Sequence, residues 1–201
     1  MPAGTRRSRR RRLIALAELQ SGYFTAKQAL EAGYSYSAQR HHVVHQNWVR
    51  IDRGIFRLPE WPVSAREDLV RWSLWSGGRA VVSHETALSF HELGDANPAR
   101  IHLTVPPNFR AKAEGIVLHR AELGGSDIQE GAGFAVTTAV RSLVDVALGS
   151  LDLDQLAAAV SEALDRGLAT IRQLRERADA TNPRAALRIE RSLALIRDGA
   201  T

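Results

Sequence analysis

Cationic side chains gather at the amino-terminal end of the sequence. No acidic residue occurs among the first 12 residues, which hold six arginines: Arg6, Arg7, Arg9, Arg10, Arg11 and Arg12. A guanidinium group matches phosphate geometry with paired hydrogen bonds, and each phosphate contact with a nucleic acid releases counterions. Residues 1–12 therefore predict a basic DNA-binding arm. A solvated tail and an RNA-binding patch are the alternatives.

The histidines and carboxylates indicate structural roles. His84 and His91 are seven residues apart on one predicted helix, about 10 Å along its axis, which is too far for a shared metal ion. Arg141 and Asp145 are spaced for an ion pair on one helix face. The sequence has neither a G-x-x-x-x-G-K-[S/T] nor a G-x-G-x-x-G motif. We therefore expect no catalytic residue, no metal and no cofactor.

Composition narrows the class of protein further. The 201 residues include 27 Lys and Arg against 22 Asp and Glu, and no Cys, which excludes disulfides and thiolate metal sites. The 189 residues after the arm carry 21 basic and 22 acidic side chains, so the arm holds the entire excess of positive charge. No apolar run approaches the roughly 18 residues of a membrane span. We expect one or two small domains in a cytoplasmic protein.

The elements that would position these side chains begin with three short helices. Apolar spacing predicts helices over residues 13–20 and 26–32, the second capped by Thr25, and a third from Ser35 or Ser37 to residue 46. Apolar residues then recur at every second position over residues 48–51 and 55–58, which predicts two strands joined by an Asp-Arg-Gly turn. This order over residues 13–60 is typical of a winged helix-turn-helix, a fold that also serves in protein interaction.

The third helix is the element that such a fold inserts into the major groove. Its periodicity predicts an inward stripe of Ser37, His41, Val44 and Trp48. We then expect the DNA-contacting residues on the opposite face of this helix and on the hairpin, together with the two candidate cap residues and a lysine of the second helix. The full set is Lys27, Ser35, Ser37, Gln39, Arg40, His42, Val43, Gln46, Arg50, Arg53 and Arg57. The alternative is a solvated helix face on a protein-interaction module.

Residues 62–201 predict a mixed α/β domain with a helical carboxyl-terminal part, which makes the chain α+β overall. Alternating segments predict strands near residues 100–105, 115–120 and 133–136, and helices are expected over 65–75, 84–93, 138–148, 153–166, 170–178 and 183–197. Apolar stripes in the last helices would form a homodimer interface or close the domain core, and the sequence leaves both alternatives open. One stripe is Leu153, Leu156, Val160 and Leu164, and the other is Leu187, Ile189, Leu193, Leu195 and Ile196.

Five segments together resemble the AbiEi antitoxins of type IV toxin–antitoxin pairs. They are residues 22–29 (GYFTAKQA), 50–58 (RIDRGIFRL), 82–87 (VSHETA), 101–106 (IHLTVP) and 136–145 (VTTAVRSLVD), within a resemblance that covers about residues 13–170. Relatives often have a glycine before the wing, where this chain has Gln46 and Asn47. Its third helix is also rich in histidine where theirs is rich in arginine.

The resemblance implies an antitoxin that binds its own operator DNA through the winged helix-turn-helix and represses its operon. It also implies that residues 62–201 counteract a toxin of the nucleotidyltransferase type. Two alternatives remain: an antitoxin that inactivates its toxin covalently by kinase-like phosphotransfer, and a transcriptional regulator that has no toxin. The expected partners are double-stranded DNA, the toxin and a second copy of the chain on DNA.

Overall fold

The computed structural model describes residues 5–64, 66–149 and 151–199. The fold is mixed α+β, as predicted, and the chain divides into two compact units. The first comprises Met1–Arg79 with Glu130–Phe134, and the second comprises Ala80–Gln129 with Ala135–Thr201. The first unit therefore continues beyond the boundary near residue 60 that the sequence suggested.

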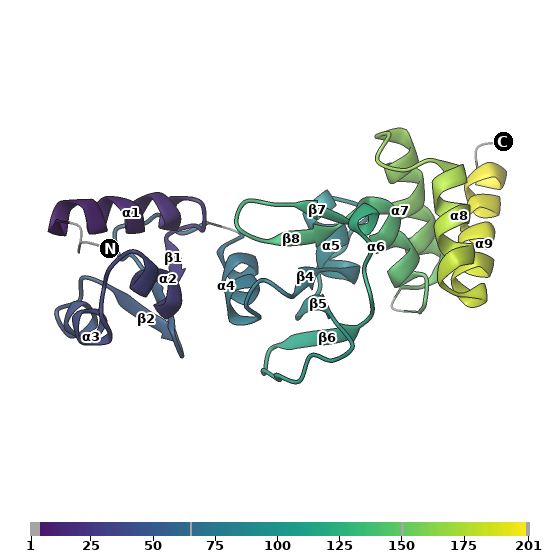
Figure 1. The fold of residues 1–201 in the computed structure, drawn as a ribbon. Coiled ribbons are helices and arrows are strands. Elements are labelled where there is room, and N and C mark those ends of the chain that lie inside the picture. Colours follow the sequence, from purple (N-terminus) through teal and green to yellow (C-terminus); the bar gives the residue numbers. More distant parts are fainter. Residues whose placement is uncertain (1–4, 65, 150, 200–201) are drawn as a thin grey trace. The chain divides into compact units, whose positions relative to one another are not determined.

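The first unit combines helices with a small antiparallel sheet (Figure 1). Along the chain it forms α1 (Arg6–Glu18), β1 (Tyr23–Thr25), α2 (Ala26–Glu31), α3 (Tyr36–Val44), β2 (Val49–Asp52), β3 (Ile55–Arg57) and α4 (Glu67–Trp75). The strand order is β1-β3-β2, with Phe24 opposite Phe56 and Val49 opposite Arg57. The hairpin was predicted, whereas β1 was not, because three residues are too few to show a period.

Local signals explain the helix boundaries in this unit. Thr25 and Gln28 form a reciprocal capping box at α2, and the Ser35 hydroxyl accepts a hydrogen bond from the Ala38 amide at the start of α3. At the other end of α3, Gln46 adopts a left-handed backbone conformation with φ 57°. Glycine adopts that conformation without steric cost, whereas a side chain makes it less favourable.

Aromatic rings form the centre of the first unit's core. Trp48 is 4% exposed, and its ring meets Phe24 edge-on at 4.9 Å between centroids. Tyr34 approaches the same indole at 5.0 Å, and the His42 imidazole stacks on it at 4.6 Å. Leu13 of α1 and Phe56 of β3 complete this cluster. The rings therefore join the loop after α2, the helix α3 and the sheet.

The second unit is built on a five-stranded mixed sheet. Its elements are β4 (Val81–Val82), α5 (His84–His91), β5 (Ile101–Val105), β6 (Ile116–Arg120), η1 (Gly125–Asp127), β7 (Ile128–Glu130), β8 (Ala135–Thr137), α6 (Ala139–Val146), α7 (Leu153–Asp165), α8 (Ile171–Thr181) and α9 (Pro183–Gly199). The order is β6-β5-β4-β8-β7, with β4 antiparallel to β5 and parallel to β8. The predicted strands and helices are present. β4 and β7 were not predicted.

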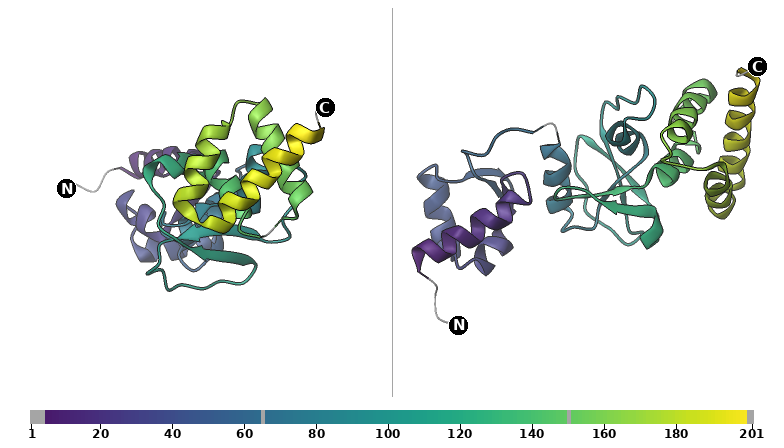
Figure 2. Two further views of the ribbon diagram at one scale, coloured as in Figure 1. Left: turned by 90° about the vertical axis from the view of Figure 1, so that its right-hand side faces the viewer. Right: turned by 90° about the horizontal axis from the view of Figure 1, so that it is seen from above.

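The carboxyl-terminal helices close a core of their own. α7, α8 and α9 lie side by side (Figure 2), with Leu156, Leu174 and Ile189 fully buried among them. Leu187 and Leu195 of the predicted stripe on α9 remain 53% and 41% exposed. Most of the stripe residues thus serve the core, and the homodimer stays a prediction.

A buried ionic network ties α6 to neighbouring elements. Arg141 donates to Asp145 at 2.8 Å, as the i,i+4 spacing predicted, and also to Asp127 of η1 at 3.2 Å. Arg177 of α8 adds a third bond, at 2.7 Å, to the same Asp127 oxygen. Asp127, Arg141 and Asp145 are at most 6% exposed, so the pairs replace the hydration that these charges lose.

Candidate nucleic-acid interface

The arginine cluster is helical. Residues 1–4 of the predicted arm lie outside the described residues, but Arg6–Glu18 form α1, with Thr5 accepting a hydrogen bond from the Ser8 amide at its start. The prediction of an arm ahead of the first helix is therefore wrong for residues 6–12. Leu13 and Ala17 are buried on the same helix, and their packing extends helical structure toward the arginines.

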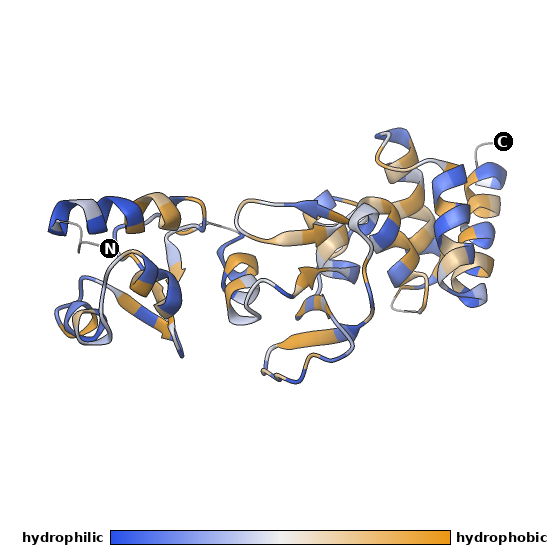
Figure 3. Cartoon of the chain, in the orientation of Figure 1, coloured by the Kyte–Doolittle hydropathy of each residue, from blue (hydrophilic) through white to orange (hydrophobic). Residues whose placement is uncertain are grey.

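The helix distributes these guanidinium groups around its axis. Arg6, Arg7, Arg10, Arg11 and Arg12 are exposed. Arg9 is half-buried and donates to the Gly33 carbonyl at 3.2 Å, which fixes α1 to the loop that precedes α3. The first turns of α1 are hydrophilic and its later turns apolar (Figure 3). Five of the six arginines are therefore accessible to a ligand.

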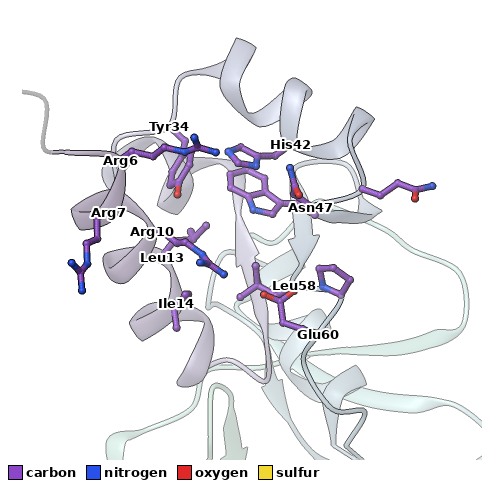
Figure 4. Close-up of a pocket in the computed structure, with 13 residues that line it drawn as sticks. Arg6, Arg7, Arg10, Leu13, Ile14, Tyr34, His42, Asn47, Leu58 and Glu60 are labelled. Carbon is purple, nitrogen blue, oxygen red and sulfur yellow. The ribbon is translucent and has the colours of Figure 1, made fainter.

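A pocket of about 630 Å³ lies between α1 and the end of α3 (Figure 4). Arg6, Arg7 and Arg10 contribute to its wall, together with Tyr34 and His42. In Figure 4, Arg6 extends past the Tyr34 ring toward His42, whereas Arg7 points away from the rings. Burial lowers the pKa of His42, and the positive charges of His41 and Arg6 act in the same direction. The positive charge in the lining of this pocket at neutral pH therefore comes from the arginines, which share the lining with the carboxylate of Glu60.

The outward face of α3 differs from the predicted one. Gln39 is 3% exposed, and its side-chain amide donates to the carbonyls of Ala26 at 3.0 Å and Tyr34 at 3.1 Å. His42 and Val43 are half-buried against the core. The assignment of Gln39 to a DNA-facing surface is therefore wrong, because this side chain holds α3 in place, whereas the DNA contact of the partly exposed His42 and Val43 stays a prediction.

The predicted inward stripe is likewise wrong for the helix itself. Ser37, His41 and Val44 are exposed, and only Trp48 is buried. The helix ends at Val44, and the backbone adopts a left-handed conformation at Gln46. The prediction placed Trp48 on the helix at 100° per residue, and this spacing does not hold beyond Val44. Of the predicted residues, Ser35, Ser37, Arg40 and Gln46 are exposed. Two further side chains on α3 are exposed although the sequence did not predict it, Tyr36 at 70% and Val44 at 69%.

The remaining predicted contacts divide between surface and structure. Lys27, Arg50 and Arg53 are exposed on α2 and the hairpin. Arg57 is not available: its side chain is 12% exposed and donates to the Trp61 carbonyl at 2.9 Å and to Glu67 at 3.3 Å. Its assignment to DNA contact is therefore wrong. The acidic residue Glu67 at the start of α4 was the sign in the sequence that Arg57 has a partner within the unit.

Three histidines of the second unit form a separate cluster. The rings of His84 and His119 stack with centroids 3.4 Å apart, and His119 Nε2 lies 3.2 Å from His102 Nδ1. Burial lowers the pKa of His84 to about 3 and that of His119 to about 4, and repulsion among the rings contributes. Within the described ranges, no group of three or more His, Asp or Glu side chains is arranged to hold a metal ion.

Comparison with known proteins adds information on the fold. No family model matches the sequence, and no curated protein matches it. A solved structure that does match is the crystal structure of the RV2827C protein from Mycobacterium tuberculosis, with a TM-score of 0.57 and 18% identity. The match covers 98% of this chain and 84% of that one. At this identity the likeness concerns the fold alone.

The burial of Gln39 leads to a prediction about stability. Gln39→Ala should lower the free energy of unfolding by about 1–3 kcal/mol, because the buried Tyr34 carbonyl and the partly buried Ala26 carbonyl both lose this donor. Arg40→Ala, one position along on the exposed side, should change it by less than about 0.5 kcal/mol. Urea unfolding followed by tryptophan fluorescence reports on this unit, since all four Trp lie within it. Equal effects of the two substitutions would contradict the assigned faces.

The histidine cluster leads to a prediction about pH. A lowered pKa in the folded state means that the unfolded chain binds more protons below about pH 6.5, so stability is lost as the pH falls from there toward 4. Burial raises the pKa of Asp145 to about 6, which acts in the opposite direction. The test therefore compares two chains. A variant with His84→Asn and His119→Gln should show a shallower fall in melting temperature by circular dichroism between pH 6.5 and 4.5. A parallel fall in both chains would disprove it.

Proposed function

We propose that the first unit binds double-stranded DNA. The observation that carries the proposal is its charge: 14 Lys and Arg against 7 Asp and Glu give this unit a net charge of +7, while 13 against 15 give the second unit −2. Buried ion pairs do not neutralise this excess of positive charge, because five of the arginines are exposed on α1. They are Arg6, Arg7, Arg10, Arg11 and Arg12. A local excess of this kind is typical of a surface that neutralises phosphate.

The order of elements supports a winged helix-turn-helix as the binding unit. Helices α2 and α3 follow each other across a short turn at Gly33, and the β2–β3 hairpin follows α3 directly. In this fold the second helix of the pair enters the major groove and the hairpin lies against the backbone. Arg40 on α3 and Arg50 and Arg53 on the hairpin are the exposed cations placed for those contacts.

The two groups of cations have different tasks in this proposal. The α1 arginines bind phosphates without regard to sequence, and α3 contacts the base edges. Arg9 and Arg57 belong to neither group, because their guanidinium groups bond to carbonyls of the unit itself. Among the cations of the first unit, contact with DNA is thus assigned to the exposed arginines of α1, α3 and the hairpin and to Lys27.

The biological role that we propose is that of a non-catalytic antitoxin that represses its own operon, and it rests on the resemblance to AbiEi proteins. In this role the near-neutral second unit counteracts a nucleotidyltransferase toxin, and the protein acts in the cytoplasm. Among the residues that the structure describes, no helix has the length and apolar character to cross a membrane.

Substitution of the α1 arginines tests the DNA contact. A variant with Arg6, Arg7, Arg10 and Arg11 changed to Gln keeps helix propensity and should reduce the slope of log K against log salt by up to roughly 3–4, because each phosphate that is no longer neutralised accounts for about 0.9. The matched control changes four exposed cations of the second unit, namely Arg110, Arg172, Arg184 and Arg191. Fluorescence anisotropy with a duplex from the region upstream of the gene measures both. Equal slopes for the variant, the control and the wild type would refute the proposal.

Co-expression tests the antitoxin role separately. If a neighbouring gene encodes a nucleotidyltransferase that arrests growth, the full chain should restore growth, and the four-arginine α1 variant should restore it as well, because neutralisation is assigned to the second unit. Both chains are produced from an unrelated promoter, so that repression of the operon does not enter the measurement. Continued arrest with the full chain would contradict the antitoxin role and leave DNA binding to be judged by anisotropy.

A further inference from the structure

The exposed face of α3 carries a stripe that alternates apolar and cationic groups. Tyr36, Arg40 and Val44 are spaced four residues apart, so they follow one another within about 80° of the helix surface. Tyr36 and Val44 are 70% and 69% exposed, and Arg40 between them is exposed too. Tyr36 and Val44 therefore present apolar groups on either side of the Arg40 guanidinium along this nine-residue helix.

A groove beside this stripe shows which partner fits. It encloses about 500 Å³ and runs between α3 and the hairpin, with Arg50 and Gly54 on the hairpin side. Its lining includes two arginines, Arg40 and Arg50, and no acidic residue. Positive charge around apolar contacts matches the DNA major groove, where phosphates border the methyl groups of thymine.

We propose, on the basis of the DNA-binding function above, that Tyr36 and Val44 contact thymine C5-methyl groups and that Arg40 contacts a guanine between them. The thymine methyl is the apolar group of the major groove, and Arg forms two hydrogen bonds with guanine O6 and N7. Eight residues of helix rise about 12 Å, which corresponds to three or four base pairs at about 3.4 Å each. The preferred site therefore contains thymines three or four base pairs apart with a guanine between.

The experiment removes only the methyl groups. Duplexes bound by the full-length protein are selected from random sequence, and each thymine of the selected site is replaced in turn by deoxyuridine. Loss of one buried methyl should weaken binding about three- to fivefold at two positions. Val44→Ala should abolish the effect at one of them, and Val63→Ala, which truncates a side chain 78% exposed outside α3, should leave both effects intact.

The outcomes separate this inference from the proposed function. If the protein binds a duplex but deoxyuridine has no effect at any position, the contact with thymine is overturned while DNA binding stands. The same holds if the deoxyuridine effects persist unchanged in both Val44→Ala and Tyr36→Ala. If the full chain selects no duplex, the proposed function fails and this inference fails with it, which would leave a protein ligand as the occupant of the groove.

Discussion

Burial of the Trp48 indole is the interaction on which the rest of the first unit depends. Its ring contacts Phe24 of the sheet, Tyr34 before α3 and His42 on α3, so one side chain joins three segments. Truncating a buried aromatic of this size costs about 3–5 kcal/mol, a large share of a small unit's stability. Since His42 must stack on the indole, α3 can rotate little about its axis. The exposure of Tyr36, Arg40 and Val44 follows from that restraint.

The sequence was sufficient for elements whose signals are local. The Thr25 cap, the turn around Gly54 and the two hairpin strands each depend on neighbouring residues, and the structure has these elements where they were expected. Burial does not alternate along either strand, and the register of the pair shifts between Arg50 and Asp52. The face of α3 could not be found in this way. Its phase was inferred by including Trp48, whereas the left-handed conformation at Gln46 separates Trp48 from the helix. A polar residue such as Gln39 also carries no local sign that distant carbonyls will bury it.

The roles of individual arginines also could not be predicted from neighbouring residues alone. Composition located the excess correctly at the amino-terminal end, but the role of each guanidinium depends on partners far along the chain. Arg57 lies ten residues from Glu67, and Arg177 lies 50 residues from Asp127. An arginine with such a partner stabilises the fold, and one without it is available for phosphate. Separation of the two kinds required the tertiary structure, and it removed Arg9 and Arg57 from the predicted DNA-contacting set.

The middle strand of the second unit's sheet has a mechanical consequence. β4 consists of Val81 and Val82 alone, yet it joins the pair β6-β5 on one side to β8-β7 on the other. Only these two residues pair with both halves, opposite Thr104 and Leu103 on one edge and Ala135 and Val136 on the other. With so few ladder hydrogen bonds at the junction, the helix α5 carries part of the connection. It contacts both β5 and β8, His91 bonds to the Thr137 carbonyl, and the Thr86 hydroxyl accepts from the His102 amide, so the two halves of the sheet are joined as much by this helix as by the strand between them.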